Sequence, residues 1–153
     1  MPKVDLAAIE QTNRTTYPPP FDQAVKGRHQ RRVAKALGLT HFGVNEVVLE
    51  PGAWSSQRHW HENEDEFLVM LEGEAVLVED EGRTPMRAGD LAAWLKGSTN
   101  GHHLINESER PCRFIVFGGG ACTGGAYSDI DMLFTADGRY TQKDGTPYPT
   151  SAS

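Results

Sequence analysis

The sequence predicts a single all-β domain, built as a barrel or sandwich of short strands. Strand-length segments rich in valine, leucine and phenylalanine follow one another between residues 42 and 118, among them EFLVMLEG and RFIVFGG. Each segment is bounded by Gly, Pro, Asp or Asn, which are the residues that end strands. No amphipathic pattern of helical length interrupts this region. Short strands at such regular spacing are typical of β-barrels and β-sandwiches.

The length of 153 residues suits one domain, in which we distinguish three parts. Residues 1–40 are predicted to form an N-terminal arm, because the prolines of TTYPPPFDQ impose an extended conformation. Within this arm, QAVKGRHQRRVAKALGL predicts one or two helical turns. Residues 41–120 are the predicted barrel, with hairpin turns at LEGEA and RAGDL. Residues 121–153 are rich in glycine but also carry aromatic residues, so we expect this segment to pack on the barrel.

Composition narrows the range of partners and compartments. The chain has 15 Lys and Arg against 21 Asp and Glu, and a net charge of -6 without a basic block argues against a nucleic-acid partner. No apolar run approaches the roughly 20 residues of a membrane helix, and the N-terminus does not resemble a signal peptide. Two cysteines do not suggest a disulfide framework, which favours a cytoplasmic protein. Cys112 is predicted to be a small buried hydrophobic residue.

Residues 58–74, RHWHENEDEFLVMLEGE, carry the strongest chemical signal. On a strand, His59 and His61 share one face while Trp60 points to the other. Glu66 opens the following strand, and we expect a hairpin through ENED to bring it beside the two histidines. ENED itself is predicted to be a solvated acidic turn. Two imidazoles and one carboxylate suit Zn, Mn, Fe, Ni or Cu better than Ca or Mg.

A fourth metal ligand is expected from GHHLIN, residues 101–106, which contains two adjacent histidines. On a strand only one of them can face the interior. His102 shares its face with Leu104, and His103 shares its face with Ile105. Because both neighbours are apolar, alternation alone does not decide between the two histidines.

These two regions resemble the paired motifs of the cupin superfamily. The first motif corresponds to a glycine, His-x-His, a glutamate and a second glycine, found here at Gly52, His59, His61, Glu66 and Gly73. The second motif corresponds here to Gly89, Gly97, His102 and Asn106, with Leu95 at the position where proline is usual. The resemblance covers about residues 42–118. It implies a double-stranded β-helix, or jelly-roll barrel, and it assigns His102 as the fourth metal ligand.

The flanking segments resemble a group of small single-domain bacterial cupins without a settled activity. The similar segments are YPPPF, FGVN, WSSQRHWH, YSDID and KDGTPY. The resemblance implies one divalent transition metal ion, a small-molecule ligand inside the barrel, and a homodimer paired through outer strands and N-terminal arms.

Two functions fit this interpretation. The first is a metalloenzyme acting on a small polar molecule, sugar-like or carboxylated, by isomerase, lyase or dioxygenase chemistry. Its catalytic residues beyond the metal ligands are unassigned, and its pocket walls are predicted to include Leu68, Met70, Trp94, Leu104 and Phe114. The alternative is a non-catalytic, metal-dependent binding or sensor module. An enzyme should place an ionisable group near the metal, whereas a module should have a closed or wholly apolar cavity.

The metal assignment predicts near-stoichiometric transition metal in protein that is purified without a metal-affinity column. The Glu66→Gln variant should lose this metal, because the anionic ligand becomes a neutral amide. Inductively coupled plasma mass spectrometry of both proteins measures the difference. Wild-type protein that takes up no metal on reconstitution would contradict the prediction.

Overall fold

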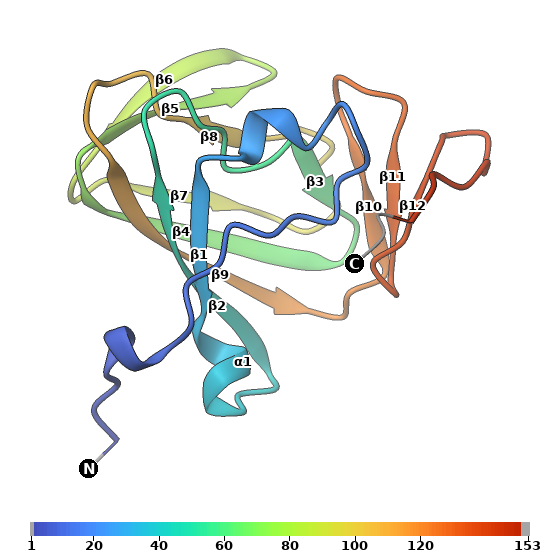
Figure 1. The fold of residues 1–153 in the computed structure, drawn as a ribbon. Helices are drawn as coiled ribbons and strands as arrows, with labels where there is room; N and C mark the ends of the chain where they lie inside the picture. The colour runs from blue at the N-terminus through green and yellow to red at the C-terminus, as the bar shows by residue number, and fades with distance from the viewer. Residues whose placement is uncertain (1, 151–153) are drawn as a thin grey trace.

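The computed structural model describes residues 2–150, and it confirms the all-β prediction (Figure 1). The largest sheet has five strands in the order β1-β2-β9-β4-β7, paired antiparallel. Its strands are β1 (Arg28–Arg32), β2 (Phe42–Leu49), β9 (Cys112–Gly120), β4 (Glu64–Glu72) and β7 (Leu91–Trp94).

Two smaller sheets complete the molecule, and a short bridge joins them. One has the order β6-β5-β8 and the other β12-β11-β10-β3. Backbone hydrogen bonds between His59 and His102 connect β3 to the segment just before β8. The strands are β3 (His59–His61), β5 (Glu74–Glu79), β6 (Gly82–Arg87), β8 (His103–Ile105), β10 (Gly124–Tyr127), β11 (Leu133–Thr135) and β12 (Tyr140–Thr141).

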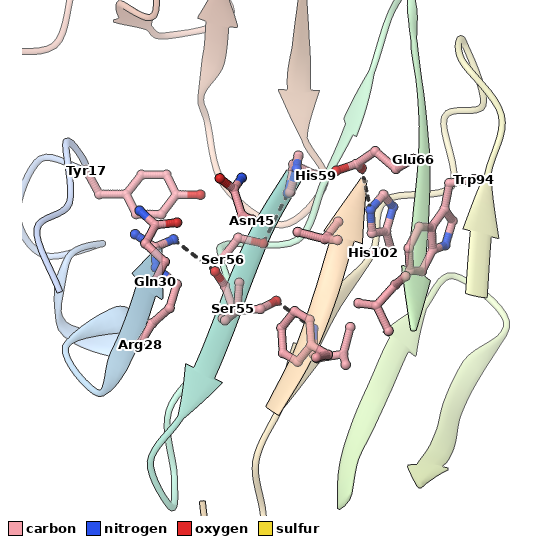
Figure 2. Close-up of a pocket in the computed structure, with 15 residues that line it drawn as sticks. Tyr17, Arg28, Gln30, Asn45, Ser55, Ser56, His59, Glu66, Trp94 and His102 are labelled. Atoms are coloured by element: carbon pink, nitrogen blue, oxygen red, sulfur yellow. Dashed lines mark hydrogen bonds and ion pairs between the residues drawn. The ribbon is translucent and has the colours of Figure 1, made fainter. Parts of the chain in front are cut away.

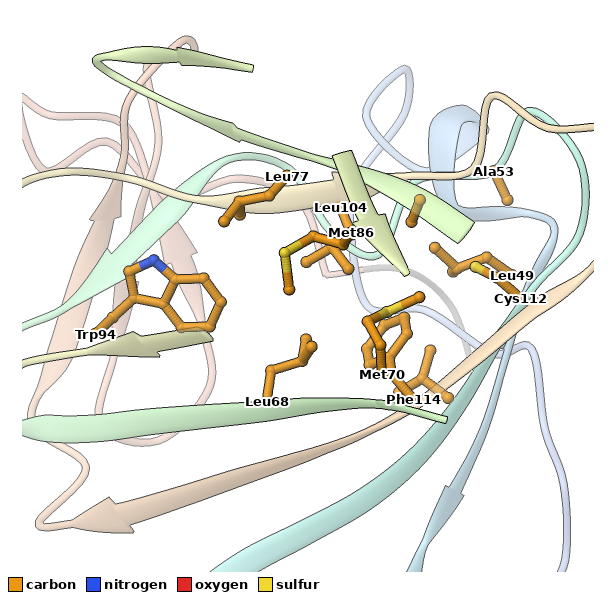
Figure 3. Packing of buried hydrophobic residues seen from close by; sticks show 12 residues of the cluster. Leu49, Ala53, Leu68, Met70, Leu77, Met86, Trp94, Leu104, Cys112 and Phe114 are labelled. Atoms are coloured by element: carbon orange, nitrogen blue, oxygen red, sulfur yellow. The ribbon is translucent and has the colours of Figure 1, made fainter. Parts of the chain in front are cut away.

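The main core lies between the sheets and is formed by alternate residues of the strands (Figure 3). On β4, Leu68 and Met70 are buried, and Phe114 of β9 lies beside them. The predicted burial of Cys112 is confirmed, because its side chain belongs to the same cluster. The remaining buried members are Val47, Leu49, Ala53, Ala75, Leu77, Met86, Trp94 and Leu104.

The turns predicted at LEGEA and RAGDL exist, but they are not hairpins. The first leads from β4 to β5 and the second from β6 to β7, so each connects two different sheets. Gly73 makes the first turn at a φ of 72°, and a Cβ there would lie 2.9 Å from the Pro111 carbonyl oxygen. Sequence alternation identifies the buried face of a strand but not its partner, so it could not distinguish these crossovers from hairpins.

The predicted helix within the N-terminal arm is largely wrong. Residues 28–32 form strand β1, which pairs with β2 from Arg28↔Leu49 to Arg32↔Asn45. Only the short helix α1 (Val33–Leu37) follows, and it ends at Gly38 in the left-handed conformation. The other helical segments are the 3-10 turns Leu6–Ala8 and Gln23–Val25. Among the described residues, none of these helices has the length and apolar character to cross a membrane.

Aromatic side chains from both ends of the chain form a second buried cluster. Tyr17 and Val25 from the N-terminal arm pack with Tyr127 and Met132 from the C-terminal segment. The rings of Tyr17 and Tyr127 meet edge to face at a centroid separation of 5.7 Å. The two flanking parts of the chain therefore contact one another as well as the sheets.

The core packing predicts a large loss of stability for Phe114→Ala, because this ring is 2% exposed. Deleting a buried phenylalanine ring costs about 3–5 kcal/mol of unfolding free energy. Phe67→Ala is the matched control, because Phe67 lies on the outer face of the same sheet and is 40% exposed. Urea unfolding of both variants measures the difference, and equal losses would contradict this assignment of the core.

Candidate metal centre and its pocket

Two histidines of β3 and one glutamate of β4 meet inside the barrel. The metal-binding atoms of His59, His61 and Glu66 all lie within 4.8 Å of one another. The Nε2 atoms of the two histidines are 3.2 Å apart, and Glu66 Oε2 lies 3.4 Å from His61 Nε2. The expected hairpin does not bring them together, because β3 and β4 belong to different sheets. The side chains meet across the interior instead.

His102 reaches the same point from the segment that pairs with His59. Its Nε2 atom lies 2.7 Å from Glu66 Oε2. Its ring stacks on the Trp94 indole at 3.7 Å, with the planes nearly parallel at 5°. His103 lies away from the cluster, with Nδ1 2.8 Å from the Ser56 carbonyl oxygen. The structure therefore groups the four residues predicted to hold a metal, and it does not place His103 among them.

Backbone and side-chain acceptors fix the orientation of the two β3 imidazoles. His59 Nδ1 lies 3.0 Å from the Gln57 carbonyl oxygen, and His61 Nδ1 lies 3.1 Å from Glu64 Oε2. Each Nδ1–H donates to its oxygen acceptor, which directs Nε2 of each ring at the cluster, where a bound metal would take the Nε2 lone pair in place of a proton.

The buried carboxylate at the centre of the cluster is not fully hydrogen-bonded by the described part of the protein. Glu66 Oε2 is buried and has no hydrogen-bond partner among residues 2–150, because its approach to His102 lacks hydrogen-bond alignment. Buried polar atoms without partners are rare in folded proteins. Imidazole nitrogens around an unsatisfied carboxylate oxygen are a donor set that divalent transition metals prefer. The donor set therefore fits a metal held by His59, His61, Glu66 and His102.

The charges in the cluster follow from burial and from short contacts. Burial lowers the pKa of His59 to about 4, so this ring is neutral near pH 7. Burial also acts to lower the pKa of His61, but the hydrogen bond to Glu64 and the nearby Glu66 carboxylate outweigh it and raise the pKa to about 9. For Glu66, burial favours the neutral acid, but contacts with His102 and His61 outweigh it and lower the pKa. Glu66 is consequently anionic and could serve as a charged metal ligand.

A cavity of about 230 Å³ adjoins the cluster (Figure 2). Glu66, His102 and Trp94 lie toward one side of it, and Arg28 and Tyr17 toward the other. The remaining lining residues are Gln30, Asn45, Val47, Ser55, Ser56, His59, Leu68, Leu104, Phe114 and Val116. Four of the five predicted wall residues line this cavity, whereas the fifth, Met70, is 1% exposed within the core. The cavity is neither closed off from the cluster nor wholly apolar.

The C-terminal segment supports the strand that carries the two histidines. Strand β10 pairs with β3, which places Gly125 opposite His61. A Cβ at Gly125 would lie 2.1 Å from the Trp60 carbonyl oxygen, so only glycine permits this close approach. The Phe134 ring then packs against the His61 ring at a centroid distance of 5.2 Å.

Sequence reasoning missed two residues that orient the ligands. Glu64 belongs to ENED, which we expected to be solvated, yet it lies on β4 and hydrogen-bonds to His61. Its spacing of two from Glu66 puts both carboxylates on one face of the strand, and this signal was available in the sequence. Trp94 was predicted as a pocket wall, and it also stacks on His102 while its Nε1–H donates to Glu79.

The fold and the site together define a class of protein, an all-β barrel that carries an imidazole–carboxylate cluster in its interior. A cupin domain model matches residues 45–118. The chain belongs to the cupin superfamily. The resemblance seen in the two sequence motifs is therefore confirmed, and so is the fold that it implied.

Solved structures give the same assignment. The chain is 44% identical to a cupin-superfamily sugar phosphate isomerase from Silicibacter pomeroyi, with 97% of each chain covered and a TM-score of 0.89. It is 20% identical to the polyketide cyclase RemF from Streptomyces resistomycificus, with 85% of this chain and 87% of that one covered and a TM-score of 0.70. The second likeness reflects the fold alone. No curated protein matches the chain in sequence.

The contact between His61 and Glu64 predicts that Glu64→Gln weakens metal binding by about 10–100-fold without abolishing it, because carboxylates that orient a ligating histidine have effects of this size. Competition with a chromogenic chelator measures the affinity. Glu62→Gln is the matched control, since Glu62 is exposed and contacts Thr123 instead. Equal affinities for the wild type and Glu64→Gln would contradict this role.

Proposed function

We propose that the chain is a metal-dependent enzyme that isomerises a small sugar-like molecule carrying an anionic group. The observation that carries this proposal is the cavity, which has the His/Glu cluster at one side and uncharged or cationic hydrogen-bonding groups at the other. The likeness to the Silicibacter pomeroyi sugar phosphate isomerase over nearly the whole chain supports the reaction class.

A metal in this cluster, when bound, would act as a Lewis acid that polarises a carbonyl oxygen of the substrate. The residues of the chain provide the surrounding conditions. Leu68, Leu104 and Phe114 form an apolar wall that limits the access of water. Low water content strengthens electrostatic interactions with the substrate.

Two hydroxyl groups in the cavity can hydrogen-bond to substrate oxygens. Burial raises the pKa of Tyr17 to about 12, so its phenol keeps its proton at neutral pH. The Tyr17 oxygen accepts the Gln57 backbone N–H at 3.3 Å, and this leaves its own proton available for a ligand. Ser56 also lines the cavity, with Oγ 3.2 Å from His59 Nδ1. These groups would orient a polyhydroxylated substrate against the cluster.

The proposal predicts that metal-loaded protein interconverts aldose and ketose phosphates, and that His59→Ala reduces turnover by at least about 100-fold. NMR spectroscopy of candidate pentose and hexose phosphates measures the reaction, with Mn, Fe, Ni, Cu and Zn loaded separately. His41→Ala is the matched control, because His41 is exposed and lies outside the cluster. Circular dichroism establishes whether each variant retains the fold.

Unchanged turnover in a folded His59→Ala variant would overturn the proposal. So would metal-loaded protein that binds sugar phosphates without converting any of them. The latter result would favour the alternative, a metal-dependent binding module on the same barrel.

A further inference from the structure

Arg28 occupies an unusual position for a charged residue. It lies on β1 opposite Leu49, which is fully buried, and Gln30 lies opposite Val47, which is 4% exposed. Partners in an antiparallel pair project to the same face of the sheet. Arg28 and Gln30 therefore face the interior with the core residues of β2, whereas His29 and Arg31 face the other side.

Among the described residues, no carboxylate is paired with the guanidinium of Arg28. Its Nη1–H donates to the Ser55 carbonyl oxygen at 2.9 Å, and its Nε is buried without a hydrogen-bond partner among residues 2–150. The neighbouring Arg31 has Glu46 at 2.8 Å, and Arg58 has Asp129 at 2.8 Å. A partly buried arginine normally has such a counter-ion, because an unpaired charge is costly to remove from water.

Three uncharged groups line the cavity together with Arg28: the side-chain amides of Gln30 and Asn45 and the protonated hydroxyl of Tyr17 (Figure 2). Gln30 and Tyr17 lie on the same wall as Arg28, and Asn45 lies between Tyr17 and His59. All three can donate hydrogen bonds, whereas Glu66, the acid that lines the cavity, lies toward the opposite side. This wall is therefore both cationic and rich in donors, which is the chemistry that binds an oxyanion.

We propose that Arg28, with Gln30, Asn45 and Tyr17, forms a subsite for the phosphate group of the substrate. The inference rests on the proposed function in one respect, namely that the remainder of the same molecule reaches the His/Glu cluster. A guanidinium and three separate donors suit the several oxygens of a phosphate ester better than the two of a carboxylate. The cavity of about 230 Å³ limits the ligand to a small molecule.

Isothermal titration calorimetry with inorganic phosphate tests this subsite on the metal-containing protein. Arg28→Gln should weaken phosphate binding by at least about 10-fold, with an unchanged metal content. Arg87→Gln is the matched control: it loses the same charge, but Arg87 lies on β6, is exposed and is outside the cavity. Its phosphate affinity should equal that of the wild type.

A second variant distinguishes the loss of a phosphate contact from a loss of structure, because Arg28 also donates a hydrogen bond to the Ser55 carbonyl oxygen. Arg28→Lys keeps the positive charge but loses the planar fork of donors, so its phosphate affinity should fall between those of the wild type and Arg28→Gln. Thermal unfolding of each variant shows whether the fold is retained. Folded Arg28 variants that bind phosphate as tightly as the wild type would overturn the proposal.

Two controls identify the anion and its position. Acetate should bind more weakly than phosphate; tighter acetate binding that depends on Arg28 would overturn the phosphate assignment in favour of a carboxylate. Phosphate binding that persists in Arg28→Gln but disappears after chelation would place the anion on the metal and would also overturn the proposal. These binding results do not depend on turnover. Arg28-dependent phosphate binding in a protein without isomerase activity would contradict the proposed function alone.

Discussion

The carboxylate of Glu66 inside the barrel is the constraint on which the site depends. Its side chain is 15% exposed and lies two residues from Leu68, which is part of the apolar core. Removing a carboxylate from water costs several kcal/mol unless opposite charges or hydrogen bonds compensate. Here the compensation comes from His61 and His102, which arrive on different segments of the facing sheets. The ligand set thus connects the two layers as well as forming a site.

The pocket has a fixed polarity, because its charged groups come from different strands. Glu66 projects from β4 in the middle of the large sheet, whereas Arg28 projects from β1 at its edge. Strands β2 and β9 separate them and contribute the apolar side chains of Val47 and Phe114 to the cavity. A ligand with one anionic end and one polar end can satisfy both walls in a single orientation, and such an arrangement favours one reaction geometry.

Much of the fold and of the metal cluster could be predicted from local sequence, because alternation and motif spacing are local properties. His59, His61 and Glu66 were found in this way. Pairing between distant segments is not local, so the crossover at Gly73 was interpreted as a hairpin. Arg28 was missed for the same reason. RHQRR has no apolar alternation, and it is a strand only because β2 offers hydrogen bonds to its backbone.

Because β3 depends on its pairing with β10, the site forms late during synthesis of the chain. Strand β3 has three residues, and its ladder within its own sheet is to β10, at residues 124–127. A strand this short has little stability until its partner is in place. During synthesis from the N-terminus, the two histidines of β3 leave the ribosome long before Gly125 and Phe134 do. The cluster consequently reaches its mature geometry after translation of the C-terminal segment, and a metal that it holds would be taken up by the completed chain.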